Sequence, residues 1–292
     1  MKTKFKFKIA AFAVIFASLL ADPARGDFTL SDSQDLIVDT SHNRGDLWGN
    51  SRVAILPGGS VNFLNTYNSS RAYIAGGGVF WLYTYDSSSA YVNNGNVMGF
   101  AVCNSSVANI SGGNISGGLF PFASSTVNFS GGYSWDTESH DSSVTNISGG
   151  GTTALWTYDS SVTNMSGGGV TYFKPLNSSV ANISGGSIHW LWTYDSSSTN
   201  ISGGSIDVLR ASNSSTVNFY CKDLSLGEGL SLDGKRLLGT GYFNGEWMDG
   251  TPYTLSISEN DPTATILIVP EPATICLLGL GGLAFLRRRR CS

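Results

Sequence analysis

Recurring tryptophan and tyrosine residues are the side chains best suited to binding a ligand. The phrases WLYTYD and LWTYD place Tyr83, Trp156 and Trp192 at one position of a repeat, with Lys174 at that position between the two tryptophans. Strand alternation turns both tryptophans outward, about 10 Å apart across two sheet layers. Flat rings at this spacing suit stacking on sugars, so the three are candidate glycan-binding residues. The alternative is that they pack against each other as ladders that stabilise the sheet.

Residues that bind metals or act as catalytic bases are sparse. His42, His140 and His189 share no position of the repeat, so the sequence predicts no histidine triad, no metal site and no cofactor. Asp141 and Asp159 are adjacent copies of one position, about 4.8 Å apart. Two such carboxylates suit Ca²⁺, although a turn-capping role explains them without an ion.

Enzymes that degrade polysaccharides on β-helical folds use clustered acidic and basic side chains. Here the basic residues of the repeat region are scattered: Arg52, Arg71, Lys174 and Arg210. No P-loop, nucleophile elbow or C-x-x-C motif is present. We therefore expect no enzyme activity, and a polysaccharide lyase or hydrolase is the least favoured hypothesis.

These side chains belong to an 18-residue repeat between Asn50 and Tyr220. A fixed period near 20 residues predicts a stack of repeats, each burying its apolar side against its neighbours. Second and third apolar positions follow five and eight residues after the first, with Ser134, Thr152, Gly118 and Thr137 as exceptions. The first position is filled ten times, with one 19-residue step: Leu56, Ile74, Val92, Ile110, Phe129, Ile147, Met165, Ile183, Ile201 and Phe219.

Two corners interrupt each repeat. Asp or Asn opens nine of the ten copies and is followed by serine; such residues favour turns by hydrogen-bonding their own nearby backbone. Glycine pairs such as Gly149-Gly150 form the second corner, and the runs between corners have strand composition. The pattern predicts an all-β fold, a parallel β-helix (β-solenoid) of about ten 18-residue coils that each send roughly three side chains inward.

One column of asparagines has two interpretations. Stacked amides at this position would hydrogen-bond from coil to coil as a ladder. Many of the same residues begin N-x-S, the acceptor sequence for N-glycosylation, which the repeat reproduces whether or not a sugar is attached. The column comprises Asn109, Asn128, Asn146, Asn164, Asn182, Asn200 and Asn218.

The flanking segments divide the chain further. Residues 1–26 combine a lysine-rich start, an apolar stretch and a small-x-small cleavage site, as in a signal peptide. Residues 27–49 are expected to form an N-terminal cap with a strand near Leu36–Val38, ahead of the repeats at 50–221. Residues 222–268 are expected to form a C-terminal β cap, because an uncovered last coil exposes unpaired backbone groups.

The C-terminal segment, 269–292, contains a 14-residue apolar run, 273–286, followed by four arginines. A helix of that length covers about 21 Å, less than the about 30 Å of a bilayer core. We therefore expect a short transmembrane segment that holds a precursor transiently in the inner membrane, with the arginines in the cytoplasm.

Val269-Pro270-Glu271-Pro272 stands directly before this apolar run. A Pro-Glu-Pro motif, a short apolar segment and a terminal arginine cluster, in this order, resemble the PEP-CTERM sorting signal of Gram-negative bacteria. The resemblance implies that an inner-membrane exosortase recognises Pro270, Glu271 and Pro272. It also implies delivery of the protein to the cell surface or the extracellular polymer matrix.

Charge and cysteine content restrict the possible binding partners and disulfide bonds. Without its two end segments the chain keeps eight basic and nineteen acidic residues, a net charge of −11, which disfavours nucleic acid and anionic lipid surfaces. Cys103 and Cys221 lie more than six coils apart, about 29 Å at the layer spacing, beyond the about 7 Å that a disulfide spans. Both are expected to be unpaired.

Together these features predict an exported, non-enzymatic protein of the cell surface or extracellular matrix, with a structural or adhesive role. The alternative is a polysaccharide-binding protein that uses the aromatic column, with an extracellular polysaccharide as its partner.

Overall fold

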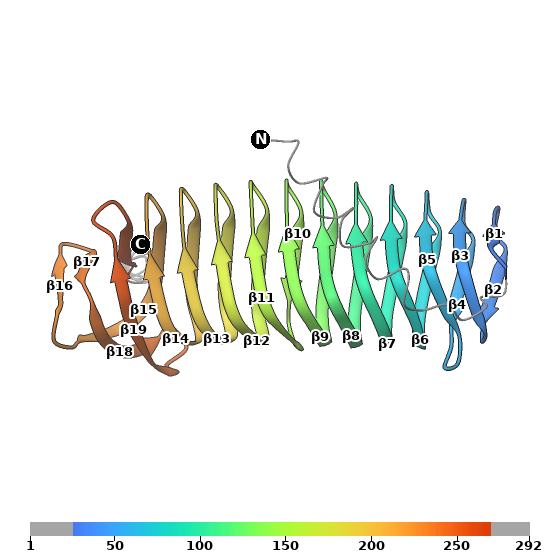
Figure 1. The fold of residues 1–292 in the computed structure, drawn as a ribbon. Coiled ribbons are helices and arrows are strands. Elements are labelled where there is room, and N and C mark those ends of the chain that lie inside the picture. Colours follow the sequence, from blue (N-terminus) through green and yellow to red (C-terminus); the bar gives the residue numbers. More distant parts are fainter. Residues whose placement is uncertain (1–25, 270–292) are drawn as a thin grey trace, which may run out of the picture.

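The computed structural model describes residues 26–269, which form one long stack of β-coils (Figure 1). The prediction of an all-β parallel solenoid is confirmed, with about eleven turns at a spacing near 18 residues and no helix in the described part. The strands are β1 (Phe28–Leu30), β2 (Asp35–Val38), β3 (Ser41–Leu47), β4 (Arg52–Ile55), β5 (Ser60–Thr66), β6 (Arg71–Thr84), β7 (Ser89–Val102), β8 (Val107–Pro121), β9 (Thr126–Ser139), β10 (Val144–Ile147), β11 (Gly151–Thr157), β12 (Val162–Pro175), β13 (Val180–Thr193), β14 (Ser198–Ala211), β15 (Thr216–Leu226), β16 (Leu230–Asp233), β17 (Arg236–Gly239), β18 (Gly241–Trp247), β19 (Pro252–Asn260) and β20 (Thr265–Val269).

The predicted apolar column forms a continuous buried line, with one correction. Ile55, which is fully buried, pairs with Ile74, whereas Leu56 is only half-buried. The Leu56–Gly59 loop is one residue longer than its counterpart in the next coil, because Ser60 pairs with Gly78. The first coil therefore has 19 residues. The sequence period alone places Leu56 in the first apolar position, whereas Ile55 occupies it.

The second 19-residue step is located by the register of β8. Val97 pairs with Ile115 at an offset of 18, but Phe100 pairs with Leu119 at an offset of 19. Leu119 is fully buried, so it fills the third apolar position that the period had assigned to Gly118. The inserted residue lies between Ile115 and Leu119 and leaves the rest of the stack in register.

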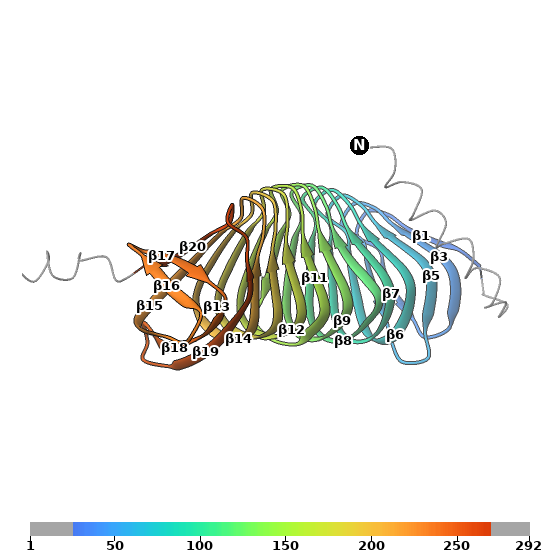
Figure 2. The ribbon, with the colours of Figure 1, turned by 60° about the vertical axis from the view of Figure 1, so that its left-hand side comes forward.

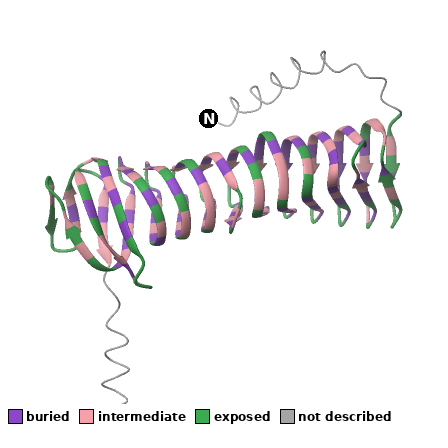
Figure 3. Ribbon diagram, turned by 90° about the horizontal axis from the view of Figure 1, so that it is seen from below, coloured by how far each residue is buried: buried purple, intermediate pink, exposed green. Residues whose placement is uncertain are grey.

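Each coil sends six side chains inward rather than the three expected, and Figure 3 shows the resulting bands of buried residues. Small residues fill the three additional columns, which flank the corners. One is serine in ten successive coils, all essentially inaccessible: Ser51, Ser70, Ser88, Ser106, Ser125, Ser143, Ser161, Ser179, Ser197 and Ser215. One of the others holds alanine, valine or threonine, as at Ala72, and the last holds threonine more often than any other residue, as at Thr84.

The Asp and Asn corners adopt the left-handed conformation, with φ between 57° and 60° from Asn68 to Asn213. The sequence suggested that these side chains cap their own turn, but the carboxylates do not. Asp159 Oδ2 instead accepts from the backbone N–H of Asp141, one coil earlier, at 3.2 Å, and Asp86 Oδ2 accepts from Asn68 at 3.1 Å. These corners therefore connect successive coils through hydrogen bonds.

The asparagine column forms the amide ladder. From Asn128 to Asn218, each Nδ2 donates to Oδ1 of the asparagine in the preceding coil, at 2.9 to 3.0 Å. Six consecutive bonds tie seven coils together. The side-chain nitrogens that a glycan would occupy are engaged within the ladder.

The N-terminal segment adds to the stack. β2 pairs in parallel with β4, and β3 pairs in parallel with β5. Leu30, Val38 and Leu47 continue the core, and the ring of Phe28 lies against the backbone of Gly45. Residues 27–49, expected as a cap, thus carry a further turn.

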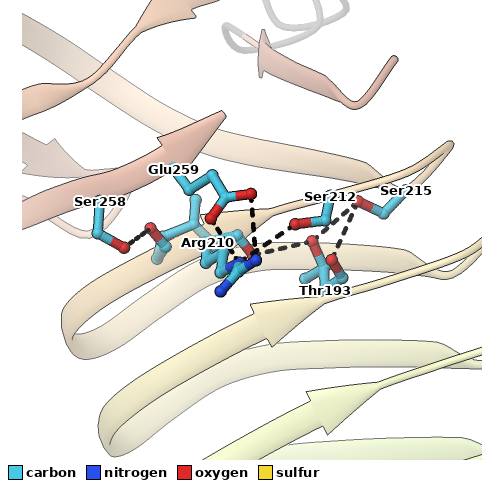
Figure 4. Close-up of polar contacts among 7 residues, drawn as sticks. Thr193, Arg210, Ser212, Ser215, Ser258 and Glu259 are labelled. Atoms are coloured by element: carbon cyan, nitrogen blue, oxygen red, sulfur yellow. Dashed lines mark hydrogen bonds and ion pairs between the residues drawn. The ribbon is translucent and has the colours of Figure 1, made fainter. Parts of the chain in front are cut away.

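The C-terminal segment folds as antiparallel hairpins at one end of the rod, followed by a last coil (Figure 2). β19 and β20 return to pair in parallel with β14 and β15. Arg210 of β14 and Glu259 of β19 form an ion pair at 2.8 Å that joins this coil to the solenoid (Figure 4). The repeat, which the sequence loses after Tyr220, therefore reappears once at Pro252–Val269.

Within residues 26–269, no helix is both long and apolar enough to cross a membrane. The expected signal peptide at 1–26 and the short apolar segment at 273–286 lie outside the described residues, except for Gly26.

Candidate functional site: an outward aromatic and charged column

Tyr83, Trp156 and Trp192 occupy one outward column, as their positions in the repeat predict. Each is half-buried and directly follows a buried leucine of the core. Register pairs Tyr83 with Asn65 and Ala101, and Trp156 with Glu138 and Lys174. We call the set from Tyr83 to Arg210 the outward column; its members are Tyr83, Ala101, Phe120, Glu138, Trp156, Lys174, Trp192 and Arg210.

Lys174 fills the space between the two tryptophans. Its Nζ lies 4.1 Å from the ring centroid of Trp156 and 4.4 Å from that of Trp192, within the range of a cation–π interaction. Burial and, secondarily, the positive charge of Arg210 lower the pKa of Lys174. One face of each indole is therefore occupied by the protein's own ammonium group, and this contact favours the packing interpretation for these two rings.

Tyr83 also packs within the protein. Its ring lies 5.6 Å from that of Trp81 and 6.2 Å from that of Tyr85, both nearly parallel to it. Burial raises the pKa of Tyr83, and it raises the pKa of Tyr85 to about 12. Neither phenol ionises near neutral pH, so this end of the outward column is an uncharged aromatic surface.

The adjoining column, just before the Asp/Asn corner, contains two runs of stacked rings. Trp48, Tyr67 and Tyr85 follow one another at centroid distances of 4.0 and 5.1 Å. Phe122, His140 and Tyr158 do the same at 5.1 and 4.6 Å. Stacked pairs of this kind contribute about 0.5–1.5 kcal/mol beyond their buried area, so the rings stabilise the rod along its axis.

An acidic group that the sequence analysis missed lies on β9, beside Trp156. Burial, then the charge of Glu138 and a hydrogen bond with it, raise the pKa of Asp136 to about 7. Glu138 Oε2 lies 3.5 Å from His140 Nε2. Alternating Asp-x-Glu-x-His on a strand is the sequence signal that would have indicated this cluster.

Asp141 and Asp159, the pair considered for Ca²⁺, are engaged in the corner bonds described above. Across residues 26–269, no group of three or more His, Cys, Asp or Glu side chains is arranged to hold a metal. Cys103 and Cys221 are free thiols, as their separation predicts. Burial raises the pKa of Cys103 to about 11, which makes it a poor nucleophile.

The folded body reaches the start of the C-terminal motif without a spacer. Val269 is the last residue of β20 and pairs with Tyr220 of β15, while Pro270, Glu271 and Pro272 lie outside the described residues. Comparison with known families matches residues 269–290 to the PEP-CTERM protein-sorting motif. This chain carries a PEP-CTERM sorting signal. The signal marks an exported protein that is handled by an exosortase.

No curated protein and no solved structure matches the chain. The sorting motif covers 22 of the 292 residues, so the role of the solenoid itself is argued from its geometry.

Proposed function

We propose that the chain is a structural rod of the cell surface or extracellular matrix, exported and then released from the inner membrane through its PEP-CTERM signal. The observation that carries the proposal is a continuous stack of coils joined end to end with a sorting motif. The outward rings, amides and carboxylates mostly bond to the next coil. Side chains used in this way build a stiff support.

The test is to replace Pro270, Glu271 and Pro272 with alanine, glutamine and alanine in the full chain and to follow its mass and location in cells. We expect the parent to lose its C-terminal segment and to appear outside the inner membrane. The variant should keep the segment and remain in the membrane fraction. Pro262→Ala, in a turn of the cap, is the matched control and should be processed normally. Identical processing of the parent and the triple variant would contradict the proposal.

A second candidate function is polysaccharide binding. It is favoured by aromatic side chains that project beyond the stacks: Trp135 is 59% exposed, and Tyr133 and Tyr172 are each 38% exposed. Exposed rings of this kind stack on sugars, whereas the facing sides of Trp156 and Trp192 are occupied by Lys174.

Affinity electrophoresis in gels that contain different polysaccharides separates the two candidates. If the rod binds glycans, Trp135→Ala should weaken retardation about tenfold, since one stacking ring contributes on the order of 1 kcal/mol or more. Tyr83→Ala, Trp156→Ala and Trp192→Ala test the outward column in the same gels. If the parent migrates without retardation in every gel, polysaccharide binding is excluded and the structural role is the remaining candidate.

A further inference from the structure

Departures from the repeat concentrate in one part of the rod, residues 123–158, which we call the central segment. It comprises β9, β10 and β11. Elsewhere the second and third core positions hold Val, Ile, Leu or Phe, but here three of the four hold Ser134, Thr137 and Thr152, all buried, and only Leu155 keeps to the pattern. The Ser134 and Thr152 hydroxyls donate to the carbonyls of Asp136 and Ala154, two residues along their own strands. Those bonds do not connect one coil to the next.

The core is also incompletely filled here. A cavity of about 10 Å³ is lined by Phe129, Thr137, Thr145 and Ile147, among others, which is room for roughly one water molecule. In the flanking coils Leu and Phe occupy the position of Thr137, as at Leu119 and Phe173. Replacing a large apolar side chain with threonine loses contact between successive coils.

A break in the strand and unpaired polar atoms also occur in the central segment. Between Arg71 and Ala211 the central segment contains the only coil whose strand is split, at Ser148–Gly150 between β10 and β11. The buried hydroxyls of Ser125, Ser143 and Thr157 have no hydrogen-bond partner, and neither does Oδ1 of Asp136. Outside the central segment, the described chain has such atoms at Thr163, Ser197 and Thr199.

The corner that opens the central segment is strained. Ala123 has φ of 58°, where the other eight non-glycine corners from Asn68 to Asn213 use Asp or Asn. The left-handed conformation costs alanine more than asparagine. Ala123 also has no side-chain oxygen to accept a bond from the preceding coil, as Asp86 and Asp159 do.

We propose that the central segment is a joint that opens before the coils on either side and divides the rod into two cooperative blocks, residues 28–121 and 162–269. In a stack whose coils contact only their neighbours, stability is a sum of local terms and contact terms. Local opening begins where both are weakest. The core substitutions, cavity, split strand, unpaired hydroxyls and strained corner all weaken the same two coils.

Hydrogen exchange of the full chain, read by mass spectrometry of peptides, tests the joint. Amides of residues 126–157 should exchange at least about tenfold faster than those of 89–102 and 180–193. Thr137→Leu combined with Thr152→Val restores the repeat's core residues and should slow exchange of 126–157 about tenfold. Ala123→Asn, a change at a half-buried corner that relieves its strain, should slow the same peptides even if the double variant packs poorly.

Thr199→Ala is the matched control. It removes an unpaired buried hydroxyl from a distant coil, at a column where Ala181 and Ala108 are found, and should leave exchange of 126–157 unchanged. Equal exchange along the parent rod would overturn the proposal. So would repair variants that slow every coil to the same extent, because the rod would then open as one unit.

Discussion

Single side chains in the corners decide whether a coil bonds to its neighbour. Each buried serine lies beside the threonine column of the preceding coil: Ser88 with Thr66 at 2.9 Å and Ser106 with Thr84 at 3.1 Å. Val102, Pro121 and Pro175 interrupt that column. The serines next to these three, Ser125, Ser143 and Ser197, are the ones in the column whose hydroxyl has no hydrogen-bond partner.

Ser106→Ala and Ser143→Ala should therefore differ in cost. The first removes bonds to the hydroxyl and carbonyl of Thr84, and we expect a loss of about 1–2 kcal/mol in the free energy of unfolding. The second removes an unpaired hydroxyl and should be neutral or stabilising. Urea denaturation followed by circular dichroism measures both, and equal destabilisation would show that the threonine partner is unimportant.

Asp136 makes stability depend on pH in a defined direction. Its pKa rises from 3.8 to about 7 on folding, through burial and then the charge of Glu138. A carboxyl whose folded pKa is raised binds more protons in the native state, so its contribution is complete below pH 3.8 and is lost as pH rises through about 7. Glu138, His140, Trp156 and Tyr158 face this group.

Asp136→Asn should remove that pH dependence. We expect the variant to be more stable than the parent above pH 7 and close to it near pH 4, because asparagine carries no charge to bury. Thermal melts from pH 4 to pH 8 give the comparison. A stability difference that stays constant across this range would show that Asp136 does not titrate as proposed.

At the scale of the strand and corner, the two glycines of each pair have different tasks. The second, such as Gly168 with φ of 79°, needs a left-handed backbone. The first allows close approach: a Cβ on Gly167 would lie 2.4 Å from the carbonyl oxygen of Ser148 in the preceding coil. Both are required for successive corners to nest.

Gly167→Ala should therefore destabilise the rod by about 1–3 kcal/mol, since backbone must move to relieve the contact. Gly169→Ala is the matched control, because a Cβ there would meet only the Ser187 hydroxyl at 3.5 Å and should be tolerated. Differential scanning calorimetry measures the melting temperatures of the two variants. Equal melting temperatures would contradict the role assigned to the first glycine.

The sequence predicts those elements whose side chains recur, and it fails where geometry depends on loops or on neighbours. The ten-member apolar column is readable from spacing, but the extra residue in Leu56–Gly59 shifts its first member to Ile55. The last coil, β19–β20, is hidden because residues 227–251 separate it from β15 in the sequence. The contact of Lys174 with both indoles depends on how far its chain extends, which spacing does not give.

For the whole molecule, the two ends of the rod are protected differently. The C-terminal end is covered by hairpins and bonded through Arg210 and Glu259. The N-terminal end presents short strands, β1 and β2, with exposed Asp35 and Asp39 beside Ile37, which is 65% exposed. Short, charged edge strands resist pairing with other chains.

Asp35→Asn with Asp39→Asn should therefore promote end-to-end association. We expect the apparent mass from light scattering to rise with concentration and the parent to remain unchanged under the same conditions. Glu228→Gln with Asp233→Asn removes two exposed charges at the hairpin end and serves as control. Association of the control to the same extent would attribute the effect to net charge rather than to the edge.

From β1 to β15, every coil pairs with the one before it, at offsets of 17 to 20 residues. This order also bears on how the rod is made. A chain that crosses a membrane with its amino end leading delivers these coils in the order in which they stack. Each newly exported segment can pair with the coil that folded before it. It requires no residue that has still to cross the membrane. Assembly can thus keep pace with secretion, and only the closing hairpins must wait for the final residues.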